Sequence, residues 1–403
     1  MTNPLAALPL PAGIRARSVD NHNGLRAHVL EAGFETAGRP ALLLLHGFPE
    51  LAYSWRKVMG PLAQAGFHVI APDQRGYGRT TGWDAHYDGD LASFRISNLV
   101  LDALGLLSAL GLRSVAAVIG HDFGSPVAAN CALMRPDVFR SVALMSAPYA
   151  GPPALAFETA GPPALPFETA GPPALPFETA DAASAATAPA PDLHAELAAL
   201  ARPRKHYQWH YATRGAEAEM RHCPQGLHAF LRAYYHHKSA DWPANQPFEL
   251  TGRTATELAK LPDYYVMDLH QGMAETVAPQ RPSAAQIAAC AWLPDAELAV
   301  YAAEFARTGL QGGLNWYRCA TDGHSNADLQ LFSGRRIEVP ALFIAGRSDW
   351  GARQSPGALQ AMQREACAQL QGCHFVDGAG HWVQQEQPAE VVRLLTNFLR
   401  ADA

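Results

Sequence analysis

The stretch "VIGHDFGSPVA", residues 118–128, presents one acidic side chain between two glycines. Its pattern predicts a tight turn from a strand into a helix, with the residue between the glycines presented at the turn. Where that residue is a serine it attacks a carbonyl carbon, but here it is Asp122. A carboxylate is ionised at neutral pH and can displace a leaving group from a saturated carbon. The pattern therefore predicts a covalent ester on Asp122, with capping of the following helix as the alternative role.

Two glycine-containing loops near the end of the chain can supply a base and its partner. The stretch "GAGHWVQQEQP", residues 378–388, carries His381, and "FIAGRSDWG", residues 343–351, carries Asp349. Asp349 can hold the neutral imidazole in the tautomer that leaves its other nitrogen free as a base. Asp377, just before the histidine loop, is a second candidate for this acid.

A third loop can supply donors for a developing negative charge. The stretch "LLLLHGFPE", residues 42–50, is a strongly apolar run followed by a His-Gly-Phe-Pro turn. Such a turn can leave a backbone N–H aimed at the site, here that of Phe48. Together with the backbone N–H of Phe123, it predicts an oxyanion hole that holds a tetrahedral intermediate.

The elements that must position these loops alternate between strands and helices. Short apolar runs predict the strands, and longer segments with apolar residues at helical spacing predict the helices between them. Such alternation is typical of a mostly parallel sheet with helices on both faces. In these sheets ligands bind beyond the carboxyl ends of the strands, and the residues expected to converge there are His46, Asp73, Asp122 and Ser146. The expected strands are residues 25–31, 41–45, 68–72, 114–119 and 141–145, and the expected helices are residues 54–65, 96–110 and 126–135.

The middle of the chain interrupts this alternation. Residues 151–180 are three copies of a ten-residue unit of the type "GPPALPFETA", and its paired prolines exclude a regular helix or an interior strand. With the Ala/Pro-rich stretch that follows, they predict an expanded surface loop to about residue 192. The segment after it is predicted to be helical without strands, up to residue 318. Alternation then resumes with a strand at residues 339–346, a helix near residues 356–370, a strand near residue 373 and a final helix through Leu399.

The predicted fold is one α/β core with an inserted helical cap. The division places the first part of the core at residues 1–147, the repeat loop at residues 148–192, the cap at residues 193–325 and the second part of the core at residues 326–403.

Composition narrows the classes of partner. The chain has 403 residues, 48% of them hydrophobic, and its net charge of −6 comes from interspersed charges, which argues against binding to nucleic acid or an anionic membrane. Its apolar runs are too short to span a bilayer, and its first residues lack a basic region typical of a secretory signal. The six cysteines form no CxxC pair, which favours reduced thiols and a cytoplasmic location. For the oligomeric state, a homodimer is one of the forms that the sequence allows.

These motifs resemble the α/β-hydrolase superfamily, and specifically its epoxide hydrolases, over nearly the whole chain outside the repeat. The resemblance covers "HGFP", "DQRGYG", the "GHDFG" turn, "GHW" and the chain order of nucleophile, acid and histidine. Its most specific motif is "GGLNWYR", residues 312–318, where the family carries a tyrosine, here Tyr317. A second family tyrosine, early in the cap, matches Tyr207, because the family pattern places it eight residues before a glycine, here Gly215. The alternatives are Tyr211, one turn later, and Tyr234 and Tyr235.

The resemblance implies hydrolysis of an epoxide to a vicinal diol, without a cofactor. Both tyrosines donate hydrogen bonds to the epoxide oxygen while Asp122 attacks carbon, and water activated by His381 then hydrolyses the ester. The expected reactants are a small apolar epoxide and water. The alternatives are a haloalkane or haloacid dehalogenase with the same triad, and a ligand-binding homologue without catalysis. A haloalkane dehalogenase holds its halide with side-chain donors where this sequence has Phe48 and Phe123.

Some positions depart from the family or remain unassigned. Phe123 and Ser125 replace the Trp and Ala that are common there, which predicts a changed pocket shape. His206 and His210 have the spacing of helical zinc ligands, but no HExxH glutamate lies between them, so no metal site is predicted. His121 is predicted to be structural. The aromatic residues expected to make the pocket apolar are Trp209, Tyr211, Tyr264 and Tyr265.

Overall fold

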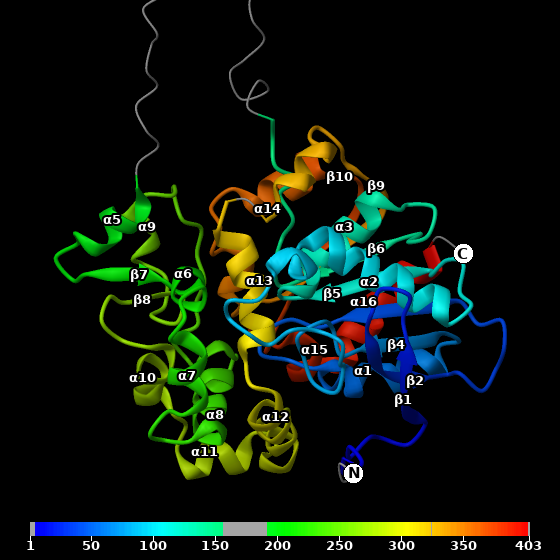
Figure 1. The fold of residues 1–403 in the computed structure, drawn as a ribbon, viewed down its shortest axis with the longest axis horizontal. Helices are drawn as coiled ribbons and strands as arrows, with labels where there is room; N and C mark the ends of the chain where they lie inside the picture. Colours follow the sequence, from blue (N-terminus) through cyan, green and yellow to red (C-terminus); the bar gives the residue numbers. More distant parts are fainter. Residues whose placement is uncertain (1–4, 156–191, 324, 402–403) are drawn as a thin grey trace, which may run out of the picture.

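The computed structural model of the protein describes residues 5–155, 192–323 and 325–401. An eight-stranded sheet runs through it in the order β1-β2-β4-β3-β5-β6-β9-β10 (Figure 1). β2 pairs antiparallel with β1 and β4, and the neighbours from β4 to β10 pair in parallel. The strands are β1 (Ile14–Asp20), β2 (Arg26–Ala32), β3 (Ala41–Leu45), β4 (His68–Pro72), β5 (Ala117–His121), β6 (Val142–Met145), β9 (Ile337–Gly346) and β10 (Cys367–Val376).

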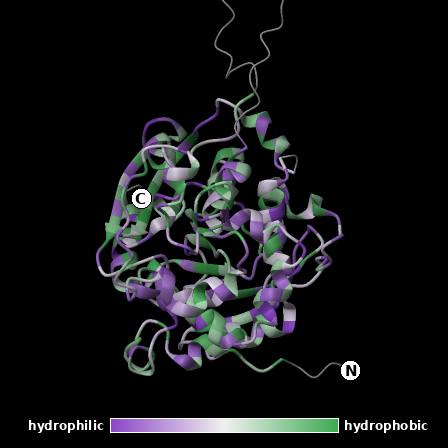
Figure 2. Ribbon diagram, turned by 90° about the vertical axis from the view of Figure 1, so that its left-hand side faces the viewer, coloured by the Kyte–Doolittle hydropathy of each residue, from purple (hydrophilic) through white to green (hydrophobic). Residues whose placement is uncertain are grey.

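Helices cover both faces of this sheet. Leu42 and Leu44 of β3 pack with residues of the helices on one face, and Leu43 and Leu45 pack with those on the other. Successive side chains of a strand point to opposite faces, so a strand buried on both sides must be apolar throughout. Figure 2 shows hydrophobic and hydrophilic residues alternating along many of the helical ribbons. The first face carries α1 (Arg56–Gln64), α15 (Val383–Glu386) and α16 (Pro388–Ala401), and the second carries α2 (Ile96–Ala109) and α3 (Gly124–Met134).

The described chain between β6 and β9 forms a mainly helical body beside the sheet (Figure 1). It also contains two short antiparallel strands, β7 (Arg204–His206) and β8 (Val266–Asp268). The prediction that this part has no strands is therefore wrong, because a strand of three residues is too short for an alternating pattern to show. The helices are α5 (Leu193–Ala198), α6 (Tyr207–Tyr211), α7 (Ala216–Arg221), α8 (Leu227–Lys238), α9 (Ala255–Leu258), α10 (Met273–Val277), α11 (Ala284–Ala289), α12 (Asp295–Thr308) and α13 (Gln311–Thr321).

Polar contacts join the helical body to the core. Tyr235 donates its hydroxyl hydrogen to the carbonyl of Pro49 at 2.8 Å. Arg79 forms an ion pair with Glu304 at 2.7 Å, and both side chains are largely buried. Separation of the two parts would leave the buried charges of Arg79 and Glu304 without a partner, which is costly. These contacts therefore hold the helical body against the core.

The predicted elements differ from the observed ones mainly near the end of the chain. β3 and β4 have the predicted bounds, and the unpredicted β1 is an edge strand with a mostly exposed surface. The helix predicted near residues 356–370 forms but is shorter, because α14 (Ala358–Ala361) and a π-helical turn (Met362–Ala366) end where β10 begins. Pairing of β10 with β9 outweighs the helical pattern of that segment. Most of the predicted repeat loop lies outside the described residues. The 3₁₀ helices are η1 (Ala52–Trp55), η2 (Leu91–Phe94), η3 (Ala278–Gln280), η4 (Ala327–Phe332) and η5 (Trp350–Ala352).

Candidate active site

Asp122 occupies the turn between β5 and α3 in a conformation that presents its side chain. Its φ of 51° lies in the left-handed region, which side chains with a Cβ seldom adopt. The neighbouring Gly124 has no room for a side chain, because a Cβ there would lie 2.3 Å from the carbonyl oxygen of Leu45. The strained turn of residues 120–124 and its flanking glycines are therefore needed together, as the sequence pattern predicts.

His381 lies between two carboxylates. Its Nδ1 is 3.0 Å from Oδ1 of Asp349, and its Nε2 is 3.2 Å from Oδ2 of Asp122. All three side chains are at most 11% exposed. Nε2 has no hydrogen bond of good geometry within the described residues. The alternative acid Asp377 is instead 82% exposed and pairs with Arg347, so the structure brings Asp349 to His381.

The charges of this group depend on one another. Burial opposes ionisation of Asp122, but the close approach and charge of the His381 side chain outweigh it and hold the pKa of Asp122 well below its usual value. The pKa of Asp349 is lowered in the same way, because the charge and hydrogen bond of His381 outweigh burial. Both carboxylates are therefore ionised at neutral pH.

The Asp122 carboxylate also accepts a backbone N–H from the turn after β3. The N–H of Phe48 donates to Oδ1 of Asp122 at 2.9 Å. Phe123 is the N-cap residue that directly precedes α3, so its own N–H lies at the partly positive end of that helix. The Phe123 ring packs edge-on against Trp316 and Tyr317, at centroid distances of 5.2 and 5.1 Å.

Tyr317 reaches the site because α13 approaches the core very closely. The backbone of Gly312 lies against that of Gly76, and a Cβ on Gly312 would be 2.2 Å from the Gly76 carbonyl oxygen. Trp316 also donates its indole N–H to the carbonyl of Arg75 at 3.0 Å. The "DQRGYG" and "GGLNWYR" motifs are thus two sides of one contact that positions Tyr317.

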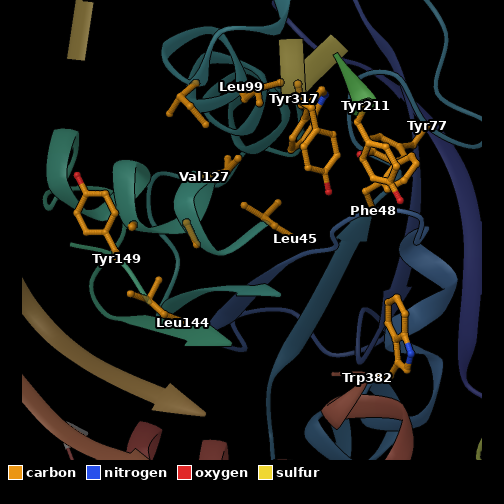
Figure 3. Close-up of a cluster of buried hydrophobic side chains, with 14 of the residues drawn as sticks. Leu45, Phe48, Tyr77, Leu99, Val127, Leu144, Tyr149, Tyr211, Tyr317 and Trp382 are labelled. Atoms are coloured by element: carbon orange, nitrogen blue, oxygen red, sulfur yellow. The ribbon is translucent and has the colours of Figure 1, made fainter. Parts of the chain in front are cut away.

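Of the two candidate tyrosines early in the helical body, Tyr207 lies at the cavity and Tyr211 does not. Tyr207 lines the same cavity as Asp122 and Tyr317. Its hydroxyl donates to Oε1 of Gln354 at 3.4 Å and accepts from Nε2 of Gln208 at 3.3 Å. Tyr211 lies with Phe48 and Tyr77 in the aromatic cluster beside Tyr317 (Figure 3), and its hydroxyl donates to that of Tyr234 at 3.3 Å.

Both tyrosine hydroxyls of the cavity stay protonated. Burial, with the charge of Asp122 as the next cause, raises the pKa of Tyr207 and Tyr317 well above the usual tyrosine value. Neutral phenols can donate hydrogen bonds to a substrate oxygen. In contrast to Tyr207, the Tyr317 hydroxyl makes no hydrogen bond within the described residues.

The cavity that contains these groups has a volume of about 480 Å³. Its wall combines the Asp122 carboxylate, the side chains of Tyr207 and Tyr317, apolar side chains and two glutamines. The aromatic residues expected to make the pocket apolar do not line it, because Trp209 faces a neighbouring cavity and the others pack behind Tyr207 and Tyr317. Residues that line the site cavity include Asp122, Phe123, Tyr149, Tyr207, Tyr317 and Gln354.

Comparison with known proteins shows the family of the chain. A model of the alpha/beta hydrolase fold family matches residues 40–388. Epoxide hydrolase A of Mycobacterium tuberculosis is 33% identical over 396 residues, which cover 95% of this chain and 96% of that protein. The chain belongs to this family, among its epoxide hydrolases.

Solved structures of epoxide hydrolases have the same fold. An epoxide hydrolase from an endophytic Streptomyces is 32% identical, with a TM-score of 0.70 and 97% of this chain and 96% of that chain covered. Epoxide Hydrolase A from Mycobacterium thermoresistibile is 31% identical, with a TM-score of 0.66 and 96% and 98% covered. The resemblance drawn from the motifs, and the predicted α/β core with a helical insertion, are confirmed.

In this epoxide hydrolase family member, sequence reasoning missed the partner of His121. Nδ1 of His121 lies 2.6 Å from Oε2 of Glu50, and its Nε2 lies 2.7 Å from the carbonyl oxygen of His381. Burial lowers the pKa of His121, but the charge and hydrogen bond of Glu50 outweigh it and raise the pKa to about 9. Glu50 stands directly after the "HGFP" turn, which was the available signal.

Lys238 is a second charged group that the sequence did not single out. Its ammonium lies over the rings of Tyr265, Tyr234 and Trp382, at 5.0, 5.3 and 5.7 Å from their centroids, and the residue is 3% exposed. It adds to the causes that lower the pKa of Asp122. Its position at the end of α8 brings a positive charge of the cap close to Asp122.

The two histidines with zinc-like spacing bond to other groups. His210 lies 2.9 Å from Oε1 of Glu219, and Nδ1 of His206 accepts the N–H of Gln208 at 3.4 Å. Within the described ranges, no group of three or more His, Cys, Asp or Glu side chains is arranged to hold a metal ion. None of the described helices has the length and apolar character needed to cross a membrane.

Proposed function

We propose that this epoxide hydrolase family member converts an epoxide to a vicinal diol through a covalent ester on Asp122. The observation that carries the proposal is the shared cavity, in which the Asp122 carboxylate and the Tyr207 and Tyr317 hydroxyls face the same space. A carboxylate nucleophile with two neutral donors fits a strained ring, because the ring oxygen leaves as an alkoxide and needs a proton.

In the first half-reaction, an oxygen of Asp122 forms a bond to an epoxide carbon while the bond from that carbon to the ring oxygen breaks. The ring oxygen takes a proton from one of the two tyrosines, Tyr207 or Tyr317. Gln208 supports this step, because its N–H donates to the Tyr207 oxygen and stabilises the negative charge left there.

In the second half-reaction, the free Nε2 of His381 takes a proton from water, and the hydroxide adds to the ester carbonyl carbon. The N–H groups of Phe48 and Phe123 hold the oxyanion. When the intermediate collapses, the diol oxygen takes the proton from His381, and the new carboxylic acid of Asp122 returns a proton to the tyrosinate. Asp349 keeps the imidazole in place throughout.

Several finer features belong to the same proposal. The cavity volume and its partly apolar wall favour a small apolar epoxide. The six free cysteines favour a reducing cytoplasm. The division into core (residues 1–147 and 326–403) and cap (residues 193–325) is supported by the sheet, whose strands all fall in the two core segments.

A dehalogenase with the same triad fits less well. Phe48 and Phe123 offer no side-chain donor to a departing halide. A halide also leaves without taking up a proton, so a dehalogenase would not need two protonated tyrosines at the cavity.

The substrate test uses purified protein with styrene oxide and, in parallel, 1-chlorobutane. We expect diol formation from the epoxide and no chloride release above the rate without enzyme. Chloride release without any diol would overturn the proposal in favour of the dehalogenase.

A further inference from the structure

Glu386 is a partly buried carboxylate that the proposed reaction does not use. It lies at the end of α15, five residues after His381 in the sequence. Both of its oxygens accept backbone N–H groups from the loop that carries His381 and from the helical body. No arginine, lysine or histidine pairs with it among the described residues. Glu386 therefore connects the loop that carries His381 with the helical body, and these hydrogen bonds are called the tether below.

Three hydrogen bonds make the tether. Oε2 of Glu386 accepts the N–H of Gly380 at 2.9 Å and that of Ala240 at 2.8 Å. Its Oε1 accepts the N–H of Trp382 at 2.9 Å. Glu386 therefore binds the residues on either side of His381 and, through the same carboxylate, the chain just after α8.

His381 itself is bound to the same part of the helical body. Its backbone N–H donates to the carbonyl of Lys238 at 2.9 Å. The two backbones touch directly, since a Cβ on Gly380 would lie 2.5 Å from the carbonyl carbon of Ser239. The N–H groups of residues 380, 381 and 382 are thus all bound either by Glu386 or by the end of α8.

A carboxylate suits this place because every partner is a donor. Burial raises the pKa of Glu386, but the three N–H donors favour the ionised form, which alone offers an acceptor to each of them. An amide at the same position would keep one oxygen and turn an NH₂ group toward N–H donors, which it cannot bind. Glutamine therefore preserves the shape of the side chain and removes part of the tether.

We propose that Glu386 is a positioning residue for the second half-reaction, because it ties the His381 loop to the helical body and holds the imidazole in line with Asp122. The proposal rests on the ester mechanism proposed above. A loop with glycine at positions 378 and 380 has a flexible backbone, so its geometry depends on such bonds. A displacement of about 1 Å at a reacting group can cost roughly 100-fold in rate.

The two half-reactions separate this role from a general effect on folding. Formation of the ester needs Asp122 and the tyrosines, whereas its hydrolysis needs the base at His381. Loss of the tether should therefore slow hydrolysis and leave ester formation nearly unchanged. A variant that is merely less stable would lose active enzyme in both steps alike.

The test compares Glu386→Gln with the matched control Glu390→Gln, which removes an exposed carboxylate paired with Arg393 one helix away. Excess enzyme is mixed with styrene oxide, quenched at set times, and weighed intact by mass spectrometry to follow the ester. For E386Q we expect ester formation within about twofold of the wild type and hydrolysis slowed at least about tenfold, by the geometric argument above. The E390Q control should match the wild type in both steps.

A second variant and a second readout keep the test independent of folding and of turnover. Gly380→Ala separates the His381 loop from the end of α8 in another way, because its Cβ would lie 2.5 Å from the carbonyl carbon of Ser239, and it should give the same selective loss. In wild-type enzyme, proton NMR should show a low-field signal from the Nδ1–H of His381 bound to Asp349, and this signal should shift or broaden in E386Q and G380A but not in E390Q.

The outcomes are distinct. If the wild type forms no ester, the ester mechanism fails and the inference fails with it. If the wild type forms and hydrolyses the ester while E386Q hydrolyses it as fast as E390Q, only the positioning role is overturned. Equal slowing of both half-reactions in E386Q and G380A would overturn it as well.

Discussion

The core side and the cap side of the cavity are organised by different means. On the core side, Asp122, Asp349 and His381 each follow the end of a strand of the central sheet within a few residues. Parallel strands bring their carboxyl ends to one edge, so these positions follow from the sheet itself. On the cap side, Tyr207 begins α6 and Tyr317 lies inside α13, and only the packing of these helices brings them together. The proposed nucleophile therefore depends on local backbone geometry, whereas the proposed proton donors depend on contacts between distant segments.

Replacement of Asp122 by Asn should have the largest effect, because it removes the proposed nucleophile on the core side. The loss in kcat/KM should be at least about 10⁴-fold, as for other enzymes that lose a nucleophile. Steady-state diol formation measures it. The control Asp377→Asn changes an exposed acid and should keep wild-type activity. Turnover by D122N within tenfold of the wild type would mean that the core side is not the centre of the reaction.

Replacement of His381 by Gln should allow the ester to form but should slow its hydrolysis. Asp122 needs no base because it is already ionised, so the ester should form at close to the wild-type rate. Hydrolysis should fall by roughly 10³-fold, within the range for loss of a general base. Intact mass spectrometry after mixing with styrene oxide would show the ester accumulating. Absence of any ester at all in H381Q would contradict the separate roles of the two side chains.

The cap side can be tested by removing single hydroxyls. Tyr207→Phe and Tyr317→Phe should each slow ester formation by roughly 10²-fold or more, since each removes a donor to the leaving oxygen. Tyr211→Phe is the matched control, because its hydroxyl bonds to Tyr234 and does not reach the cavity. Its rate should stay within a few-fold of the wild type. If ester formation slowed more in Y211F than in Y207F, Tyr211 rather than Tyr207 would be the proton donor.

The smallest effect is expected at the glutamines that distinguish Tyr207 from Tyr317. Gln208→Met removes the N–H that donates to the Tyr207 oxygen. Loss of one such bond, worth about 1 kcal/mol, should slow ester formation about fivefold and leave ester hydrolysis unchanged. Rapid-quench kinetics measures both steps, with Gln369→Met at an exposed position as control. An effect on hydrolysis alone would show that Gln208 acts elsewhere.

This contrast explains how much the sequence could predict. The turn around Asp122 and the loops of Asp349 and His381 carry local patterns, because glycines and strand ends are visible in the order of residues. The fold class followed from the same alternation, and it is confirmed by the family comparison. The edge strand β1 and the start of β10 were missed, because an exposed strand and a segment with helical character have no apolar pattern of their own.

Residues that act through long-range contacts could not be predicted in this way. Gln354 meets Tyr207 across 147 positions of sequence, and Glu50 meets His121 across 71. Glu386 binds Ala240 across 146 positions. A single sequence contains no sign of which distant polar groups will pair, and the tyrosine at Tyr207 was identified only through the family resemblance.

The most direct test of the central claim is a single turnover of excess enzyme with styrene oxide in ¹⁸O-water. The account predicts that the first diol carries no label and that ¹⁸O appears in the peptide containing Asp122, because the diol oxygen comes from the carboxylate. A labelled diol from that first turnover, with unlabelled Asp122, would mean direct attack by water and would contradict the ester mechanism.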